Sequence, residues 1–326
     1  MGADPLPMLA IAVVGVPLVL GGYIYLSERL LGRGARKANS ATRAAFWLAP
    51  ALVLLLVFLV YPIVTTIVLS FKDATSASWA GLSNYGYVFT DRNMLVVLRN
   101  NLLWLVFFTL VTLTLGLLIA LLADRVKYEA VAKSLIFLPM AISFVAAGII
   151  WKFMYDFQPG GAKQVGTLNA LITTVAPGFK PVAWLFDTST NNAALIVVGI
   201  WMWTGFAMVI LSAGLKGIPV ELLEAARIDG ASELQVLSRV TLPLLGPTLI
   251  VVATTLIIDV LKIFDVVYVM TNGNLGTEVV ANRMYKEMFN YHNYGRASAM
   301  AVLLLVVIAP VMILNVRRFR QGGSNA

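Results

Sequence analysis

The sequence predicts an all-α protein built as a polytopic membrane helical bundle. Of its 326 residues, 60 % are hydrophobic and only 12 % are charged, and the mean hydropathy is +0.86. A typical soluble domain carries about 25 % charged residues, because its surface must be solvated. Seven apolar stretches are long enough to cross a hydrocarbon core of about 30 Å, which takes about 20 helical residues. The polar–apolar alternation over about ten residues that is typical of a membrane β-barrel is absent from the sequence.

The seven predicted spans follow one another along the chain, with more polar segments between them. Proline and glycine lie inside several of them, including Pro62, Pro139 and Gly148. We expect these spans to be unbroken, because neighbouring helices in a bundle can satisfy the backbone groups that such residues leave free. The spans are Leu6–Leu26, Phe46–Leu69, Leu102–Ala123, Leu135–Tyr155, Ala193–Leu215, Leu242–Leu261 and Ala299–Val316.

The first span has the charge pattern of a retained helix. Its leader, Met1–Pro5, contains an acidic residue and no basic one, whereas a signal peptide begins with a basic region. Basic residues instead follow the span, in the segment Arg29–Arg43. We therefore expect the N-terminus to lie outside the membrane and this basic loop to lie inside.

The net charge of +8, from 24 Lys and Arg against 16 Asp and Glu, fits this orientation. In a soluble protein such an excess would suggest a nucleic-acid partner. In a membrane protein it is typical of cytoplasmic loops, and the short inside loops are the segments with the higher density of basic residues. The inside basic residues are Arg29, Arg33, Arg36, Lys37, Arg43, Arg125, Lys127, Lys133, Lys216, Arg227, Arg239, Arg317, Arg318 and Arg320.

The inside loop of residues 216–240 has the pattern of two short helices joined by a turn. Pro219 suits a first helical position, and Gly230 follows the first helix where a left-handed cap is needed. Ser232 and Gln235 have the spacing of a capping box for the second helix. We expect apolar side chains to face inward and the charged ones to face water. The inward set is Leu222, Leu223, Ala226, Leu234 and Leu237, and the solvated set is Glu224, Arg227 and Glu233.

The pattern alone leaves two interpretations of this hairpin open. A rigid knob for contact with another protein and an amphipathic hairpin lying on lipid headgroups agree equally well with it. A DNA-binding helix-turn-helix is disfavoured, because the segment is tied to membrane spans at both ends and has only Lys216, Arg227 and Arg239 as basic residues.

The hairpin residues resemble the Glu-Ala-Ala loop of ABC importer permease subunits. The resemblance rests on Glu224-Ala225-Ala226, Asp229-Gly230-Ala231, Leu242-Pro243 and Pro247, with Leu237 and Val240 where Phe and Ile are common. Further stretches are similar to permeases of the carbohydrate-uptake branch, which includes maltose, alpha-glucoside and glycerol-phosphate importers. These stretches are Gly81-Leu82-Ser83-Asn84-Tyr85 with Phe89, Phe137-Leu138-Pro139 with Trp151, Gly166-Thr167-Leu168-Asn169, and the run from Phe264 to Gly273.

The resemblance implies a six-helix, MetI-like type I importer core formed by the last six spans, with the first span as an extra N-terminal helix. It implies a subunit of a bacterial or archaeal cytoplasmic membrane, paired with a second homologous permease, two cytoplasmic ATPase subunits and an extracytoplasmic sugar-binding protein, in contact with lipid and without nucleic acid. The corresponding divisions are residues 1–44, 45–96, 97–318 and 319–326, with the coupling loop at 216–240.

The resemblance also assigns roles in the loop. Glu224 would make a charge contact with the ATPase, the alanines would permit close approach, and Gly230 would make the turn. The chain has no G-x-x-x-x-G-K-[ST] sequence, so ATP and Mg²⁺ would be bound by the partner ATPase, and this chain would need no cofactor. The predicted coupling residues are Glu224, Ala225, Ala226, Arg227, Asp229, Gly230 and Ala231.

Ionisable groups near the hydrocarbon mark a candidate substrate path. Asp259, Lys262 and Asp265 are spaced by three residues, which predicts one shared helix side. Such groups are costly in a membrane and indicate a functional site, here one that offers polar partners to sugar hydroxyls. The alternative is an ion-pair staple at the outer end of the span, with Lys262 extended to the interface.

Aromatic residues supply a second set of path candidates. Trp203 beside Thr204 would offer a ring to the apolar face of a sugar and a hydroxyl to its polar edge, and Trp151 offers a similar ring. Packing between helices or against lipid is the alternative for each. His292 lies in an outside loop, where an exposed surface histidine is the simplest interpretation and a pH switch the alternative.

Two other classes of protein fit the sequence less well than a permease does. A self-sufficient secondary transporter commonly has internally repeated halves, and the pattern of Glu224–Pro247 occurs once in this sequence. An intramembrane enzyme would need a catalytic set, and with no cysteine, a single histidine and no Ser/His/Asp set inside the spans the sequence does not supply one. A metal site is not predicted either.

Overall fold

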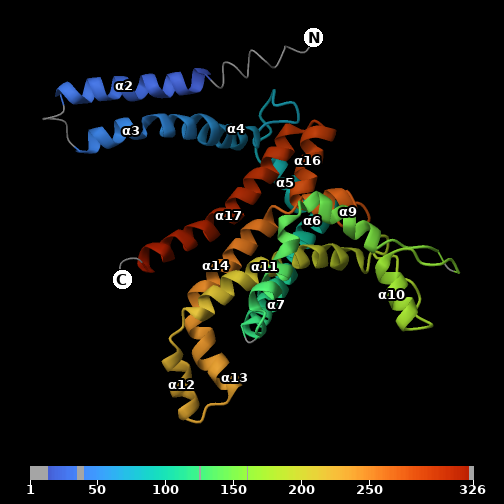
Figure 1. The fold of residues 1–326 in the computed structure, drawn as a ribbon. Helices are drawn as coiled ribbons and strands as arrows, with labels where there is room; N and C mark the ends of the chain where they lie inside the picture. Colours follow the sequence, from blue (N-terminus) through green and yellow to red (C-terminus); the bar gives the residue numbers. More distant parts are fainter. Residues whose placement is uncertain (1–13, 35–39, 125, 160, 323–326) are drawn as a thin grey trace. The chain divides into compact units, whose positions relative to one another are not determined.

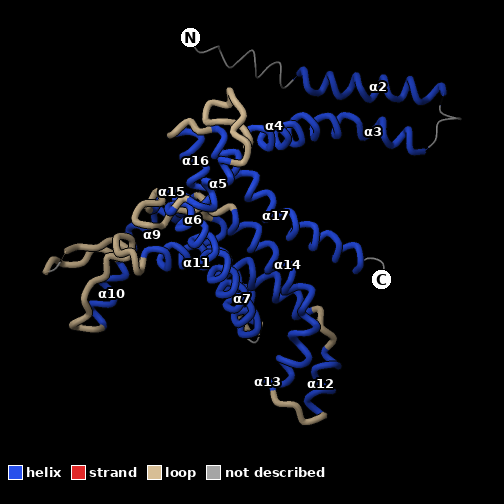
Figure 2. Tube along the Cα trace, turned by 180° about the vertical axis from the view of Figure 1, so that it is seen from behind, coloured by secondary structure: helices blue, strands red, loops and turns tan. Residues whose placement is uncertain are grey.

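The computed structural model describes residues 14–34, 40–124, 126–159 and 161–322. Contacts between residues divide the chain into two units, Met1–Thr65 and Thr66–Ala326, and each is described by itself. Regular structure in the described ranges is helical throughout, and the pairing of Lys72 with Trp79 is an isolated bridge. The all-α prediction is therefore confirmed for these residues (Figures 1 and 2).

The first unit contains α2 (Val16–Gly34), α3 (Ser40–Leu55), the π-helical turn η2 (Leu56–Val60) and the start of α4 (Tyr61–Leu69). The ring of Tyr23 in α2 stacks on Phe46 of α3 at 5.5 Å, and its hydroxyl donates a hydrogen bond to the carbonyl of Phe46. The wide turn η2 ends at Val60, two residues before Pro62. Such a turn relieves the clash of a proline ring with the preceding carbonyls, so the helix continues past it.

The second unit is a helical bundle with short helices, among them α5 and α16, at one end (Figure 1). Its elements run from α5 to α17, and the π-helical turns η3 and η5 lie within the continuous helices Arg92–Ala123 and Glu233–Leu261. They are α5 (Ser83–Thr90), α6 (Arg92–Leu103), η3 (Trp104–Phe108), α7 (Thr109–Ala123), α8 (Glu129–Phe137), η4 (Leu138–Ala141), α9 (Phe144–Met154), α10 (Thr167–Val175), α11 (Asn191–Lys216), α12 (Val220–Ile228), α13 (Glu233–Val236), η5 (Leu237–Thr241), α14 (Leu242–Leu261), α15 (Asp265–Met270), α16 (Val280–Tyr285), η6 (Lys286–Asn290) and α17 (Tyr294–Gly322).

Five helices among the described residues are long and apolar enough to cross a membrane. They contain the second, third, fifth, sixth and seventh predicted spans, and the third, sixth and seventh begin earlier than predicted. The bent pair α8–η4 and α9 makes a sixth if it is counted as one span. The five are Ala44–Leu69, Arg92–Ala123, Asn191–Lys216, Glu233–Leu261 and Tyr294–Val316.

The predicted first span, Leu6–Leu26, begins outside the described residues. Its described part lies in α2, where the apolar stretch Pro17–Leu26 is shorter than the five membrane-length helices. The structure therefore does not supply the seventh span that the sequence predicts.

The prediction of an unbroken fourth span is wrong. The chain bends by 99° between Glu129–Ala141 and Phe144–Met154. Pro139 lies in the 3₁₀ turn η4, and Ser143 is extended and caps α9 by accepting a hydrogen bond from the backbone N–H of Ala146 at 3.2 Å. The break packs on α11 at Gly205, where a Cβ would lie 2.5 Å from the carbonyl oxygen of Ile136. Proline and close backbone packing together end the helix there.

Helix α11 is the centre of the bundle and crosses α7 at small residues. Gly116 of α7 faces α11 so closely that a Cβ would lie 2.6 Å from the Cβ of Ala207 and 3.0 Å from the backbone nitrogen of Met208. Along the same face, Gly199 makes room for the fully buried ring of Trp104. The core is continuous from this crossing to α14, where Val252 and Leu256 are buried.

Buried asparagines hold the loops at the end of the second unit that carries α5 and α16, which we call the outer cap. Asn100 donates from Nδ2 to the carbonyls of Gly276 (2.7 Å) and Glu278 (2.9 Å). Asn84 donates to the carbonyls of Ser70 and Lys72, at 2.9 and 2.7 Å. A buried amide that bonds backbone groups of a distant loop fixes that loop, because breaking the contact would leave unpaired polar groups.

The α7–α11 crossing generates a stability prediction. Gly116→Ala should lower the stability of the purified protein by about 1–3 kcal/mol, because the added methyl group overpacks the crossing. We expect a lower Tm in detergent. Gly246→Ala is the matched control, since a Cβ at Gly246 of α14 meets no atom within 4 Å. Equal Tm values for the two variants would contradict the close crossing.

Candidate functional site

A helical hairpin projects from the second unit at the end opposite to α5 and α16 (Figures 1 and 2). Helix α12 forms its first arm, and residues 229–232 form the turn. The second arm is not the separate short helix that the sequence predicts. It runs from Glu233 through η5 into α14, so that the arm and the sixth predicted span are one helix, Glu233–Leu261.

The structure confirms the predicted turn and capping box of the hairpin. Pro219 is the N-cap of α12, one residue before the expected position, and Glu221 lies in the first turn. Gly230 has a φ of +84°, the left-handed conformation that disfavours other residues. Ser232 and Gln235 form the capping box, in which the backbone N–H of Ser232 donates to the side-chain oxygen of Gln235 at 2.8 Å.

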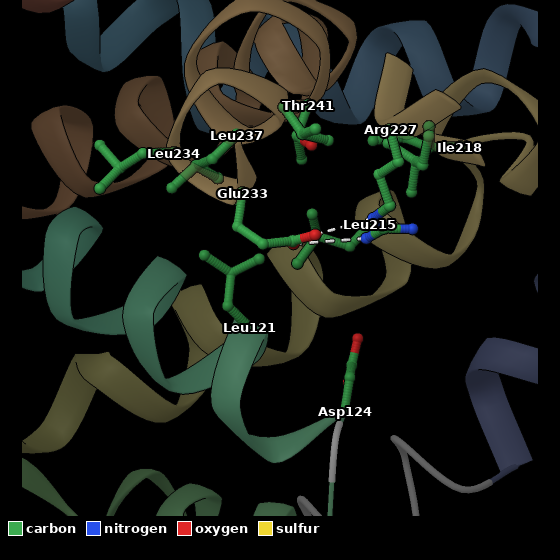
Figure 3. A pocket seen from close by; sticks show the side chains of 11 residues that line it. Leu121, Asp124, Leu215, Ile218, Arg227, Glu233, Leu234, Leu237 and Thr241 are labelled. Atoms are coloured by element: carbon green, nitrogen blue, oxygen red, sulfur yellow. Dashed lines mark hydrogen bonds and ion pairs between the residues drawn. The ribbon is translucent and has the colours of Figure 1, made fainter. Parts of the chain in front are cut away.

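An ion pair joins the two arms. The Arg227 guanidinium donates from Nε to Oε1 of Glu233 at 2.8 Å and from Nη2 to Oε2 at 3.4 Å. Figure 3 shows these two side chains pointing toward each other across the hairpin. The hydrogen bond that Arg227 donates to the Glu233 carboxylate raises the pKa of Arg227 above its ordinary value. Both side chains are about half exposed, so the pair fixes an orientation more than it adds stability.

A cavity of about 360 Å³ lies between the hairpin and the inner ends of α7 and α11. Leucines from α7, α11, α12 and the second arm of the hairpin line it, together with Asp124 at the end of α7 and the Arg227–Glu233 pair (Figure 3). The hairpin is therefore not packed flat against the bundle, and the half-buried Leu223 and Leu237 face this cavity.

The outer surface of the hairpin combines apolar and charged side chains. Ile228 is 85 % exposed and Leu234 is 78 % exposed, and Leu222 is also exposed. The prediction that Leu222 faces inward is therefore wrong. Leu234 borders the cavity but is largely open to solvent, and Glu224, Arg227 and Glu233 are exposed as predicted. Exposed apolar side chains gathered on a projecting element are typical of a protein-contact surface.

The root of the hairpin is tied by an ionic cluster that the sequence analysis did not identify. Lys133 of α8 contacts Asp124 at the end of α7 and Ser212 of α11, and its ammonium lies 2.6 Å from Oε1 of Glu129. Ser212 in turn donates to Asp124 at 2.8 Å, and Lys216 pairs with Glu129. The four-residue spacing of Glu129 and Lys133 could have predicted their ion pair. The contact of Lys133 with Ser212, 79 residues away, could not be predicted from the sequence.

The three ionisable residues of the candidate path do not share one helix. Helix α14 ends at Leu261, Lys262 is its C-cap, and Asp265 begins α15 after a break. The predicted single helical side is wrong, because the chain turns at the membrane end of α14. All three residues nevertheless line one cavity of about 180 Å³ with Phe144 and Phe264. No ion pair or hydrogen bond joins the three side chains in the described structure.

The aromatic path candidates are mostly packed inside the bundle. Thr204 is buried, and its hydroxyl donates to the carbonyl of Ile200 at 2.6 Å. Trp203 is half-buried against Phe206, with ring centroids 5.3 Å apart. Trp203 and Thr204 therefore do not present a ring and a free hydroxyl side by side.

Trp151 belongs to an aromatic core cluster and does not line the cavity. Its ring is buried and lies 5.1 Å from Tyr155 and 5.6 Å from Trp201, and its indole Nε1 has no hydrogen-bond partner among the described residues. His292 is exposed in the loop before α17, in agreement with the surface interpretation.

A second aromatic group, missed by the sequence analysis, lies beside the ionisable cavity. We call Phe264, Tyr268, Tyr285 and Phe289 the outer aromatic row. Its centroids are 5.1 Å apart between Phe264 and Tyr268, 5.4 Å between Phe264 and Tyr285, and 4.9 Å between Tyr285 and Phe289. The four-residue spacings of Phe264–Tyr268 and Tyr285–Phe289 could have predicted two neighbouring pairs, but the sequence does not indicate that the two pairs meet.

The fold, the projecting hairpin and the membrane-length helices define a transporter's membrane component. Residues 113–318 match the family described as binding-protein-dependent transport system inner membrane component. The chain belongs to this family. Its members are permease subunits of ABC importers, as the hairpin motif predicts, and the secondary-transporter alternative is set aside.

Named relatives cover most of the chain. The osmoprotective compounds uptake permease protein of Synechocystis is 57 % identical over 84 % of this chain and 98 % of its own. The alpha-glucoside transport system permease protein of Rhizobium meliloti is 46 % identical over 90 % and 87 %. The trehalose/maltose transport system permease protein of Thermococcus litoralis is 32 % identical over 87 % and 97 %.

A solved structure confirms the fold. A chain of a bacterial ABC transporter involved in the import of the acidic polysaccharide alginate superposes with a TM-score of 0.70, at 23 % identity, over 84 % of this chain and 94 % of its own. At this identity the likeness establishes the MetI-like membrane fold.

The left-handed turn generates a prediction for the hairpin. Gly230→Ala should cost about 1–2 kcal/mol, because a Cβ is strained at positive φ. We expect the amide hydrogen exchange of α12 and α13 to rise about fivefold to thirtyfold. Gly217→Ala is the control, since Gly217 has a φ of −80° and its added Cβ would meet no atom closer than 3.4 Å. Unchanged exchange in Gly230→Ala would argue against a strained turn.

Proposed function

We propose that this chain is the membrane-spanning permease subunit of an ATP-driven, binding-protein-dependent importer of a sugar, an oligosaccharide or alpha-glucoside. It would form half of the translocation path and couple to a separate ATPase through the Glu224-Ala225-Ala226 loop. The observation that carries this proposal is the projecting hairpin, which presents Glu224, Ile228 and Leu234 to solvent on the end of a membrane helix. Membership of the importer family supports it.

Energy would come from partner chains. The described residues include no P-loop, so ATP and Mg²⁺ would be bound by two cytoplasmic ATPase subunits. In the hairpin, Glu224 would make the charge contact, while Ala225, Ala226 and Ala231 leave room for close approach. Arg227 holds the arms together through Glu233, and Asp229 with Gly230 makes the turn.

The remaining partners follow from the same architecture. A second homologous permease would complete the path, and an extracytoplasmic sugar-binding protein would deliver the cargo to the outer cap. A solved relative of the fold is an alginate importer in complex with a periplasmic protein that holds an alginate pentasaccharide, which supports this arrangement. We further propose seven spans in the cell membrane, with α2 belonging to an extra N-terminal transmembrane helix.

The substrate class rests on relatives and on one cavity. Relatives named for alpha-glucoside and for trehalose/maltose transport support a glucoside cargo. The cavity of Asp259, Lys262 and Asp265 offers carboxylates and an ammonium at the outer end of α14, and sugar hydroxyls pair with both. Trp203, Thr204 and Trp151 remain proposed path residues, with positions that suit support of the wall better than direct contact.

The coupling role is tested by charge reversal on one helix. In a complex purified with its ATPase, Glu224→Lys should lower ATPase co-purification about tenfold or more, because it replaces a charge-assisted contact with repulsion. Glu221→Lys is the matched control, since Glu221 is also exposed on α12, three residues earlier. Equal loss in both variants, or loss in neither, would contradict the specific role of Glu224.

The path is tested by uptake. Complexes reconstituted with ATPase, second permease and binding protein are supplied with labelled maltose, trehalose and sucrose. Asp259→Asn and Trp203→Ala should reduce ATP-dependent uptake about tenfold while assembly is kept, because each removes a group from the proposed wall. Unchanged uptake in both variants would overturn the path assignment, and absence of ATP-dependent sugar uptake in the wild type would overturn the sugar importer.

A further inference from the structure

Two rings of the outer aromatic row are exposed and the other two, Phe264 and Tyr285, are half-buried. Phe289 is 59 % exposed and Tyr268 is 40 % exposed. In α15, Val266, Val267 and Met270 are buried on the side packed against α9, where Gly148 of α9 allows close contact. Phe264 and Tyr268, four residues apart, lie on another side of the same helical segment and stack with an interplanar angle of 21°. The row is thus not required to hold α15 in place.

The row is continuous with the ionisable cavity. Phe264 lines that cavity together with Asp259, Lys262 and Asp265, and it also contacts Tyr285 of the row. From Phe264 the rings follow one another through Tyr285 to Phe289 at 5.4 and 4.9 Å. An unbroken series of rings therefore leads from an exposed position in the outer cap to a polar cavity at the end of a membrane helix.

We propose that the outer aromatic row is a carbohydrate-binding platform that receives a glucoside in the outer cap and leads it to the ionisable cavity. This inference rests on the proposed sugar cargo. A pyranose ring has apolar C–H faces that stack on aromatic rings, while its hydroxyls need hydrogen-bond partners. The row supplies the rings and two tyrosine hydroxyls, and the cavity supplies two carboxylates and an ammonium.

The continuity also favours a sugar over a lipid occupant. An acyl chain would cover the rings but has no polar group for the charged cavity, and a docked protein is distinguished from a sugar by the assembly and ATP hydrolysis measured below. A sugar uses both surfaces, first through its apolar faces and then through its hydroxyls. A linear oligosaccharide would cover several rings at once, so the contribution of the row should grow with the number of sugar units.

The test uses the complete transporter in proteoliposomes with labelled maltose and maltotriose. Tyr268→Leu/Phe289→Leu keeps apolar volume but removes two rings. At sub-saturating sugar it should reduce maltotriose uptake about tenfold and maltose uptake less, in proportion to lost ring contacts. Assembly and binding-protein-stimulated ATP hydrolysis should stay at the wild-type level. Tyr268→Phe/Phe289→Tyr keeps both rings and should retain uptake.

Phe186→Leu is the control, because Phe186 is an exposed aromatic of the outer segments, 71 % exposed, outside the row. Uptake equal to wild type in Tyr268→Leu/Phe289→Leu would overturn the platform. Loss of the second permease from that variant would identify the row as a subunit interface, and loss of stimulated hydrolysis would identify it as a docking surface; either outcome also overturns the proposal. If the wild-type complex carries neither sugar, the proposed glucoside importer fails, and the platform fails with it.

Discussion

One uninterrupted helix connects the two candidate sites, and the rest of the second unit is arranged around it. Glu233, at the hairpin turn, and Asp259, at the ionisable cavity, lie in the same helix of 29 residues. At about 1.5 Å per residue such a helix extends over about 40 Å, the depth of a bilayer with its headgroup regions. A helix transmits displacement along its axis better than a jointed connection, because every turn is hydrogen-bonded to the next. The capping box at Ser232 matters for this reason. It starts the helix directly at the hairpin turn, so that no irregular segment lies between the exposed hairpin surface and the membrane-length helix.

The helix Glu233–Leu261 can transmit displacement only if its hairpin end is held near the bundle. Ionic contacts provide this hold, because apolar contacts are few beside the cavity. Lys133, Asp124 and Ser212 join α8, α7 and α11 at the root of the hairpin, beside the cavity of about 360 Å³. The charged groups of this cluster satisfy one another's hydrogen bonds and join the ends of three helices. The cavity separates this cluster from α12, and the Arg227–Glu233 pair joins the two arms of the hairpin.

The sequence was sufficient where a feature depends on neighbouring residues and insufficient where it depends on distant ones. The membrane-length helices, the left-handed Gly230 and the Ser232–Gln235 box are local, because composition and short spacings determine them. The break at Pro139 was mispredicted: proline alone is tolerated inside a helix of the bundle, as Pro247 of α14 shows, and the helix at Pro139 also breaks because its backbone packs on Gly205 of α11. The prediction that Asp259, Lys262 and Asp265 share one helix side was wrong for a similar reason. A three-residue spacing places residues on one side only while the helix continues, and α14 ends at Leu261. The Lys133–Ser212 contact and the outer aromatic row join residues that no periodicity relates.

The residues that carry the resemblance to sugar permeases also divide by physical role. Asn84 and Asn169 are buried and bond backbone carbonyls of distant segments, and Asn169 additionally accepts from the indole Nε1 of Trp184 at 3.2 Å. They shape the outer cap and touch no cavity described above. Phe264 and Asp265, from the last matching stretch, instead line the ionisable cavity. A shared motif in the cap therefore reports a common scaffold, and discrimination among sugars would depend on the exposed rings and charges that this scaffold holds at the outer end of α14.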